Sequence, residues 1–127
     1  MRYAYTKSPG DLPPYLRVQV HVKALGGMSK VVWGKIDTGA DCSMVPERVA
    51  EQVGATAEGF CTVVGPLGER QRARTCIISV SMDGVRFDDV EAVVASKEYF
   101  LVGRDVLNKL ILRADGSAGV FDLDYPS

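Results

Sequence analysis

Short strand-like segments follow one another along the chain, and this succession limits the possible fold more than any other feature of the sequence. The clearest of them, Leu16–Val22, alternates apolar and polar residues, which is typical of a strand with one buried face. Turn signals such as Gly26-Gly27 and Asp83-Gly84 separate the segments. Further strands are expected at residues 30–36, 60–64, 69–80, 85–87, 90–95, 99–102 and 118–123. The pattern predicts an all-β fold, either closed or sandwiched.

Two short helices are expected beside the strands. In Pro46–Gly54 the proline suits a first helical turn, Val49 and Val53 share one side, and the final glycine can end the helix. Residues Asp105–Leu110 indicate a second helical turn. The predicted fold class is therefore mainly β with two short helices.

Length and composition fit one domain with one modest core. The chain has 127 residues, of which 46% are hydrophobic and 24% charged, the balance of an ordinary globular protein. Residues 1–15 contain three of the six prolines and are predicted to form an irregular N-terminal arm. The domain itself is expected to span residues 16–127.

Charge and cysteine content exclude several classes of function. The net charge is −1, with 15 basic and 16 acidic residues spread along the chain, which argues against nucleic acid or an anionic membrane as a partner. No apolar run approaches the ~20 residues of a membrane helix, and the N-terminus lacks the apolar core of a secretion signal. The three cysteines Cys42, Cys61 and Cys76 form no metal-binding pair, so we expect reduced thiols in a cytoplasmic protein without a cofactor.

A loop after one predicted strand is the first candidate site. The segment KVVWGKI leads directly into Asp37-Thr38-Gly39, where Asp and Thr side chains can bond to nearby amides and glycine relaxes the backbone. Such a loop either ends the strand or holds a carboxylate in place. The segments VGPLG and LVGRDVL also have purely structural interpretations. Gly65–Gly68 can be a surface turn, and Gly103 can be the start of a helix.

The joint order of these three segments resembles the retropepsin-like aspartic proteases over residues 16–123. In that family an Asp-Thr-Gly-Ala loop follows an apolar strand, a glycine-tipped flap comes next, and two apolar residues then precede Gly-Arg and a short helix. The resemblance implies the acid protease fold, with a closed β-barrel or sandwich half in each chain. It also implies hydrolysis of peptide bonds by a water activated between two aspartates, without a cofactor. Because this sequence has one Asp-Thr-Gly and no Asp-Ser-Gly, the implied enzyme is a homodimer.

The resemblance also assigns roles to individual residues. Asp37 would be the catalytic carboxylate, Thr38 would brace the two loops across the dimer, and Gly39 would let the loop close around the carboxylate. The implied substrate-binding residues are Lys35, Ala40, Asp41, Gly65, Pro66, Leu67 and Gly68, the last four of them in the flap.

The second motif would support the site structurally, and it consists of Leu101, Val102, Gly103 and Arg104. Gly103 would allow a close approach to the catalytic loop, and Arg104 would pair with a partly buried Asp41. The family usually has an apolar residue where this chain has Lys35, so a cation there would favour acidic substrate residues.

Two alternatives to a cellular protease stay open at this point. A catalytically silent dimer of the same fold would bind extended peptides or serve as a dimerisation module. A viral-type enzyme excised from a polyprotein would share the chemistry. The expected partners are a second copy of the chain and a peptide or protein substrate.

Overall fold

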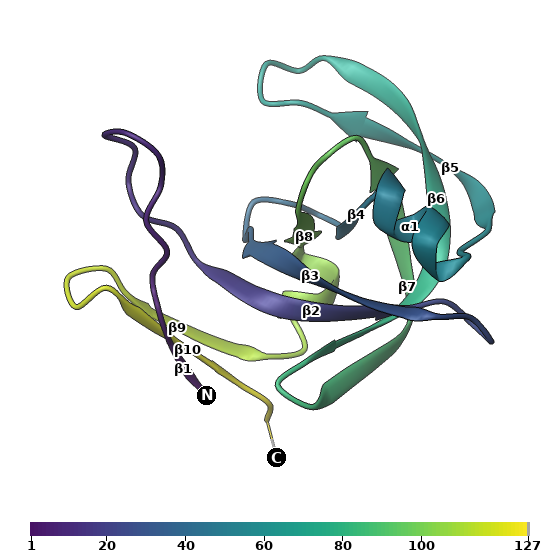
Figure 1. Ribbon diagram of the computed structural model, residues 1–127. Helices are drawn as coiled ribbons and strands as arrows, with labels where there is room; N and C mark the ends of the chain where they lie inside the picture. Colours follow the sequence, from purple (N-terminus) through teal and green to yellow (C-terminus); the bar gives the residue numbers. More distant parts are fainter. Residues whose placement is uncertain (127) are drawn as a thin grey trace.

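The computed structural model describes residues 1–126 and contains a closed β-barrel (Figure 1). Its strands, in spatial order, are β2 (Arg17–Lys23), β3 (Ser29–Ile36), β8 (Phe100–Val102), β4 (Met44–Pro46), β7 (Val85–Ala95) and β6 (Arg70–Met82). Pairing of β2 with β6 closes the barrel. The strand β5 (Ala57–Val64) pairs with β6, and their hairpin arches over the barrel in Figure 1.

The barrel interior is filled by the apolar faces of strands in which buried and exposed residues alternate. In β2, Val18, Val20 and Val22 are buried while the residues between them are exposed or half-buried, as the sequence pattern predicted. Most neighbouring strands run antiparallel, but β3 pairs with β8 and β4 pairs with β7 in parallel. The β3–β8 pairing places the carboxyl end of β3 beside that of β8.

Two short helices accompany the barrel. Helix α1 (Glu47–Val53) buries Val49, Ala50 and Val53 and ends at Gly54, whose left-handed φ of 77° favours glycine. Helix α2 (Arg104–Leu107) starts directly after β8 and buries Val106 and Leu107. The prediction of a mainly β fold with two short helices is confirmed.

A second, smaller sheet lies below the barrel in Figure 1 and contains both ends of the chain. It consists of β1 (Arg2–Ala4), β10 (Val120–Asp124) and β9 (Ile111–Asp115), in that order. The ring of Tyr3 stacks on Phe121, with ring centroids 5.0 Å apart. The prediction that the arm is irregular throughout is therefore wrong for β1, because this packing and pairing hold it as a strand.

The remaining arm, residues 5–15, forms a loop tied at its base. Thr6 and Tyr15 pair through two backbone hydrogen bonds of 2.7 and 2.9 Å.

The sequence suggested separate strands at 85–87 and 90–95, whereas β7 is continuous across a bulge at which Asp89 adopts a positive φ of 56°. Within residues 1–126, no helix is long and apolar enough to cross a membrane.

Candidate active site

The Asp-Thr-Gly loop begins where β3 ends. The Asp37 N–H donates to the Val102 carbonyl at 3.0 Å, which extends the β3–β8 pairing by one residue. The Gly39 N–H then donates to Asp37 Oδ1 at 2.9 Å, and the Ala40 N–H donates to the Asp37 carbonyl at 3.3 Å. The carboxylate is therefore oriented by its own loop while its side chain stays half-buried.

The second motif supports this loop from β8 and α2. The Arg104 N–H donates to the Ala40 carbonyl at 2.9 Å. A Cβ atom at Gly103 would lie 2.6 Å from the backbone carbonyl carbon of Cys42, so any side chain at this position would collide with the chain. Glycine at position 103 therefore permits the close approach of the second motif to the Asp-Thr-Gly loop, and this contact fixes the distance between the two motifs.

A buried serine connects the two motifs, and the sequence analysis did not identify it. Ser43 is 0% exposed, and its Oγ accepts from the Gly103 N–H at 3.0 Å and donates to Asp105 Oδ1 at 2.8 Å. The Ser43 N–H also donates to Asp105 Oδ2 at 3.1 Å. The sequence indicates this contact only by the positions of the two residues: Ser43 closely follows the first motif, and Asp105 directly follows Gly-Arg.

Arg104 and Asp41 form the ion pair that the family resemblance implied, through Arg104 Nη2 and Asp41 Oδ1. Their side chains are 48% and 84% exposed in the single chain. The expectation that Asp41 is partly buried is therefore wrong for the chain by itself, because the pair lies at the rim of the site. Water screens a pair of this kind, so its contribution within one chain is small.

The flap is the tip of the β5–β6 hairpin. The Gly65 N–H donates to the Glu69 carbonyl at 2.8 Å, and the Gly68 N–H donates to the Gly65 carbonyl at 3.0 Å. The Glu69 carboxylate accepts from the Leu67 N–H at 3.0 Å and so fixes the turn from within. Leu67 itself is 95% exposed at the tip.

A cleft of about 730 Å³ lies between the Asp-Thr-Gly loop and the β5–β6 hairpin. On the side of the Asp-Thr-Gly loop it is lined by Asp37, Gly39, Ala40, Asp41, Cys42, Met44, Lys97 and Leu101. From the flap side it is lined by Cys61, Thr62, Val63, Val64, Gly65 and Pro66. The sequence-predicted residues that do not line it are Lys35, Thr38, Leu67, Gly68, Val102, Gly103 and Arg104.

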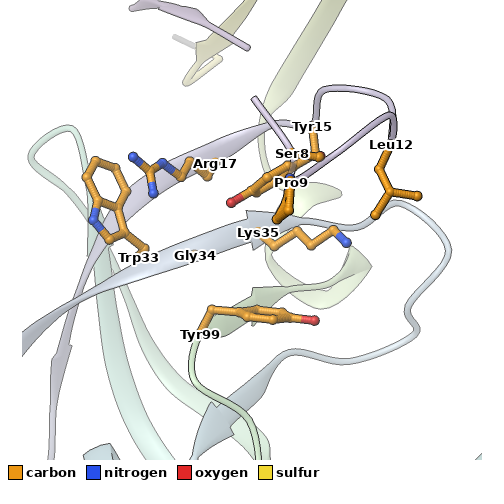
Figure 2. Close-up of a pocket in the computed structure, with 9 residues that line it drawn as sticks. All are labelled: Ser8, Pro9, Leu12, Tyr15, Arg17, Trp33, Gly34, Lys35 and Tyr99. Atoms are coloured by element: carbon orange, nitrogen blue, oxygen red, sulfur yellow. The ribbon is translucent and has the colours of Figure 1, made fainter. Parts of the chain in front are cut away.

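Lys35 lies outside this cleft. It points into a separate cavity between the arm and the barrel, beside Tyr15 and Tyr99 (Figure 2). The sequence suggested that Lys35 lies near a substrate pocket. One wall of its cavity, however, is formed by the arm, whose course had not been predicted.

The carboxylates that line the cleft are Asp37 and Asp41, and a thiol, Cys42, lies beside them. Burial, and then the nearby Asp105 carboxylate, raise the pKa of the Cys42 thiol, so it remains protonated at neutral pH. Among residues 1–126, no three or more His, Cys, Asp or Glu side chains are grouped so as to hold a metal ion.

Several solved structures share this fold. The EIAV protease is 18% identical, with 80% of this chain and 92% of that chain covered at a TM-score of 0.61. A retropepsin-like aspartic protease from Rickettsia conorii is 17% identical, with 98% and 91% covered at a TM-score of 0.65. The foamy viral protease-reverse transcriptase is 18% identical with a TM-score of 0.58, and the match covers 76% of this chain but only 12% of that one.

Sequence comparison leads to the same family. No curated protein sequence matches the chain. The sequence profile of the family described as aspartyl protease matches residues 18–115, which include the catalytic loop, the flap and the Gly-Arg motif. The chain therefore belongs to the aspartyl protease family and has the retropepsin-like fold.

Proposed function

We propose that this protein is an aspartic endopeptidase that works as a homodimer, with Asp37 of each subunit forming the catalytic pair. The observation that carries the proposal is the Asp37 carboxylate, oriented by the Gly39 N–H and facing a cleft covered by a glycine-containing flap. Family membership supports peptide hydrolysis as the class of reaction.

The proposed chemistry needs two carboxylates in different protonation states. When two carboxyl groups lie within hydrogen-bonding distance they cannot both ionise, so they share one proton. The ionised Asp37 takes a proton from a water molecule as the water oxygen attacks the peptide carbonyl carbon. The protonated Asp37 donates its proton to the carbonyl oxygen, which gives a tetrahedral diol. The Asp37 that took the water proton then gives it to the leaving nitrogen as the C–N bond breaks, and a hydroxyl proton of the diol returns to the other Asp37.

The dimer is proposed because each chain supplies only half of this pair. Thr38, which lies beside Asp37, is exposed, and within residues 1–126 its hydroxyl takes part in no hydrogen bond. A threonine left free beside the catalytic loop suits a contact with the same loop of a second copy. The flap would close over the bound peptide and exclude water that does not take part in the reaction.

The alternative is a silent dimer that binds peptides without cutting them. The intact Asp37 loop favours the enzyme, because bringing two carboxylates together destabilises a dimer that only binds. A peptide-binding module would gain stability by replacing this residue. The fold by itself does not decide between the two functions.

The test is cleavage of a random peptide mixture by the purified protein, followed by mass spectrometry. Wild-type protein should produce new peptide ends, and Asp37→Asn should produce none. Asp89→Asn is the matched control, because Asp89 is an exposed carboxylate outside the cleft whose positive φ asparagine also accepts. Peptide binding without any cleavage by the wild type would support the silent dimer, and equal cleavage by Asp37→Asn would remove this carboxylate from the mechanism.

A further inference from the structure

The cavity that contains Lys35 has a composition unlike that of the main cleft. This arm cavity has a volume of about 240 Å³ and lies where the arm folds back over the end of β3 (Figure 2). Its walls include Leu12, Tyr15, Arg17, Trp33, Lys35 and Tyr99. Two of its side chains are cations, and none is an acid.

Both cations in the arm cavity are held against aromatic rings. The Lys35 ammonium lies 5.4 Å from the ring centroid of Tyr15 and 5.9 Å from that of Tyr99. The Arg17 guanidinium carbon lies 3.8 Å from the centre of the Trp33 ring, and Figure 2 shows the two side chains stacked. These contacts hold the cations in place without neutralising their charge.

Neither cation has a carboxylate partner in the part of the chain that the structure describes. Lys35 and Arg17 are both half-buried, so each has lost part of its hydration. A partly desolvated cation without a counterion attracts an anion more strongly than a fully hydrated one does. The exposed Leu12 and the tyrosine rings would contact the methylene groups of such a ligand.

The position of the cavity links it to the catalytic loop. Lys35 is the second-to-last residue of β3, and Asp37 directly follows the strand, where its N–H continues the pairing with Val102. Their Cα atoms are therefore about 7 Å apart. A peptide whose scissile bond lay at Asp37 would bring a neighbouring side chain within reach of the Lys35 ammonium.

We propose that the arm cavity binds an acidic side chain of the substrate, with Lys35 as the residue that selects it. This inference rests on the proposed function, because it takes the peptide to lie across Asp37. The arm, through Tyr15, thereby contributes directly to specificity. The substrate class is a peptide with glutamate or aspartate beside the cleaved bond.

Trp33 allows binding to be measured without cleavage. It is the single tryptophan of the chain and lines the arm cavity, so its fluorescence reports occupancy there. The probes are peptides of one fixed sequence that carry either glutamate or glutamine, scanned across the positions flanking a cleaved bond. Titration of the Asp37→Asn protein should show, at one position, about tenfold tighter binding of the glutamate peptide, and the difference should shrink as salt is added.

Variants at Lys35 test which side chain selects the acid. In the Asp37→Asn background, Lys35→Met should bring the affinity ratio of the two peptides to about one, whereas Lys35→Arg should keep the glutamate preference. Lys30→Met is the matched control, because Lys30 lies on the same strand outside the cavity and its loss should leave the preference intact. Equal affinity for both peptides at every position, or a preference that survives Lys35→Met, would overturn the inference.

The same peptide pair separates this inference from the proposed function. In wild-type protein the glutamate peptide should be cleaved with about tenfold higher kcat/KM. Selective binding without cleavage would contradict the proposed protease function but would support the acid-binding role of the arm cavity. Cleavage without any preference between the two peptides would contradict the cavity assignment and leave the protease standing.

Discussion

At the scale of single residues, Ser43 connects the catalytic loop with the second motif. Ser43→Ala would leave the buried Gly103 N–H without its acceptor, and it would remove one of the two donors to Asp105 Oδ1, which would keep the Val106 N–H. We expect the free energy of unfolding to fall by about 1–3 kcal/mol, measured by denaturant titration. Ser117→Ala is the matched control, since Ser117 also donates to an aspartate but is exposed. Equal losses in the two variants would show that burial of Ser43 does not matter.

The Arg104–Asp41 pair should contribute little within one chain. Since both side chains are largely exposed, the coupling free energy from a double-mutant cycle of Arg104→Ala and Asp41→Ala should be about 0.2–1 kcal/mol. The cycle is measured by chemical denaturation at low salt, where screening is weakest. Strict additivity would show that the two side chains do not interact in solution.

At the scale of elements, a salt bridge fastens β1 to β10. Hydrogen bonding and charge from the Arg2 guanidinium lower the pKa of the Asp122 carboxyl below its usual value. A carboxyl whose pKa is lowered on folding stabilises the folded state above its unfolded-state pKa, and this stabilisation is lost as the pH falls through the folded-state pKa.

The pH dependence of this salt bridge can be isolated by removing the carboxyl. Wild-type protein should be more stable than Asp122→Asn at neutral pH, and the difference should shrink as the solution is acidified below the usual aspartate pKa. Thermal unfolding of both proteins across that pH range measures this change. A difference that stays constant with pH would contradict the role given to the carboxyl.

The elements also show which parts of the structure the sequence could predict. Strand β2 and helix α1 were predictable because their patterns are local, with strict alternation in one and a proline start with a glycine stop in the other. Strands β1 and β4 are short and depend on partners far away in the chain, so no local pattern marks them.

The residues of the candidate site also divide into those that a local sequence pattern marks and those that it does not. The catalytic loop and the Gly-Arg motif have sequence signatures, and the structure brings them together through Asp37, Ala40 and Arg104. The contact between Ser43 and Asp105 joins residues far apart in sequence and leaves no motif. The cavity around Lys35 depends on how the arm folds, and the arm carries no periodic pattern.

At the scale of the whole molecule, activity should depend on the proton shared by two Asp37 side chains. The rate should follow a bell-shaped pH profile, with one limb for each of the two ionisations of the pair. Initial rates measured on one cleaved peptide across the pH range provide the test. A single sigmoidal limb would indicate a catalytic group that acts without a coupled partner.

The central claim is that each active site takes one Asp37 from each of two chains. Mixing wild-type and Asp37→Asn subunits at constant total concentration, followed by equilibration, tests it most directly, with peptide cleavage as the readout. If a mixed dimer is inactive, the cleavage rate falls as the square of the wild-type fraction. Asp89→Asn, mixed in the same way, should leave the rate unchanged. A rate that falls in direct proportion to the wild-type fraction would show that one chain forms a complete active site, and the account would be wrong.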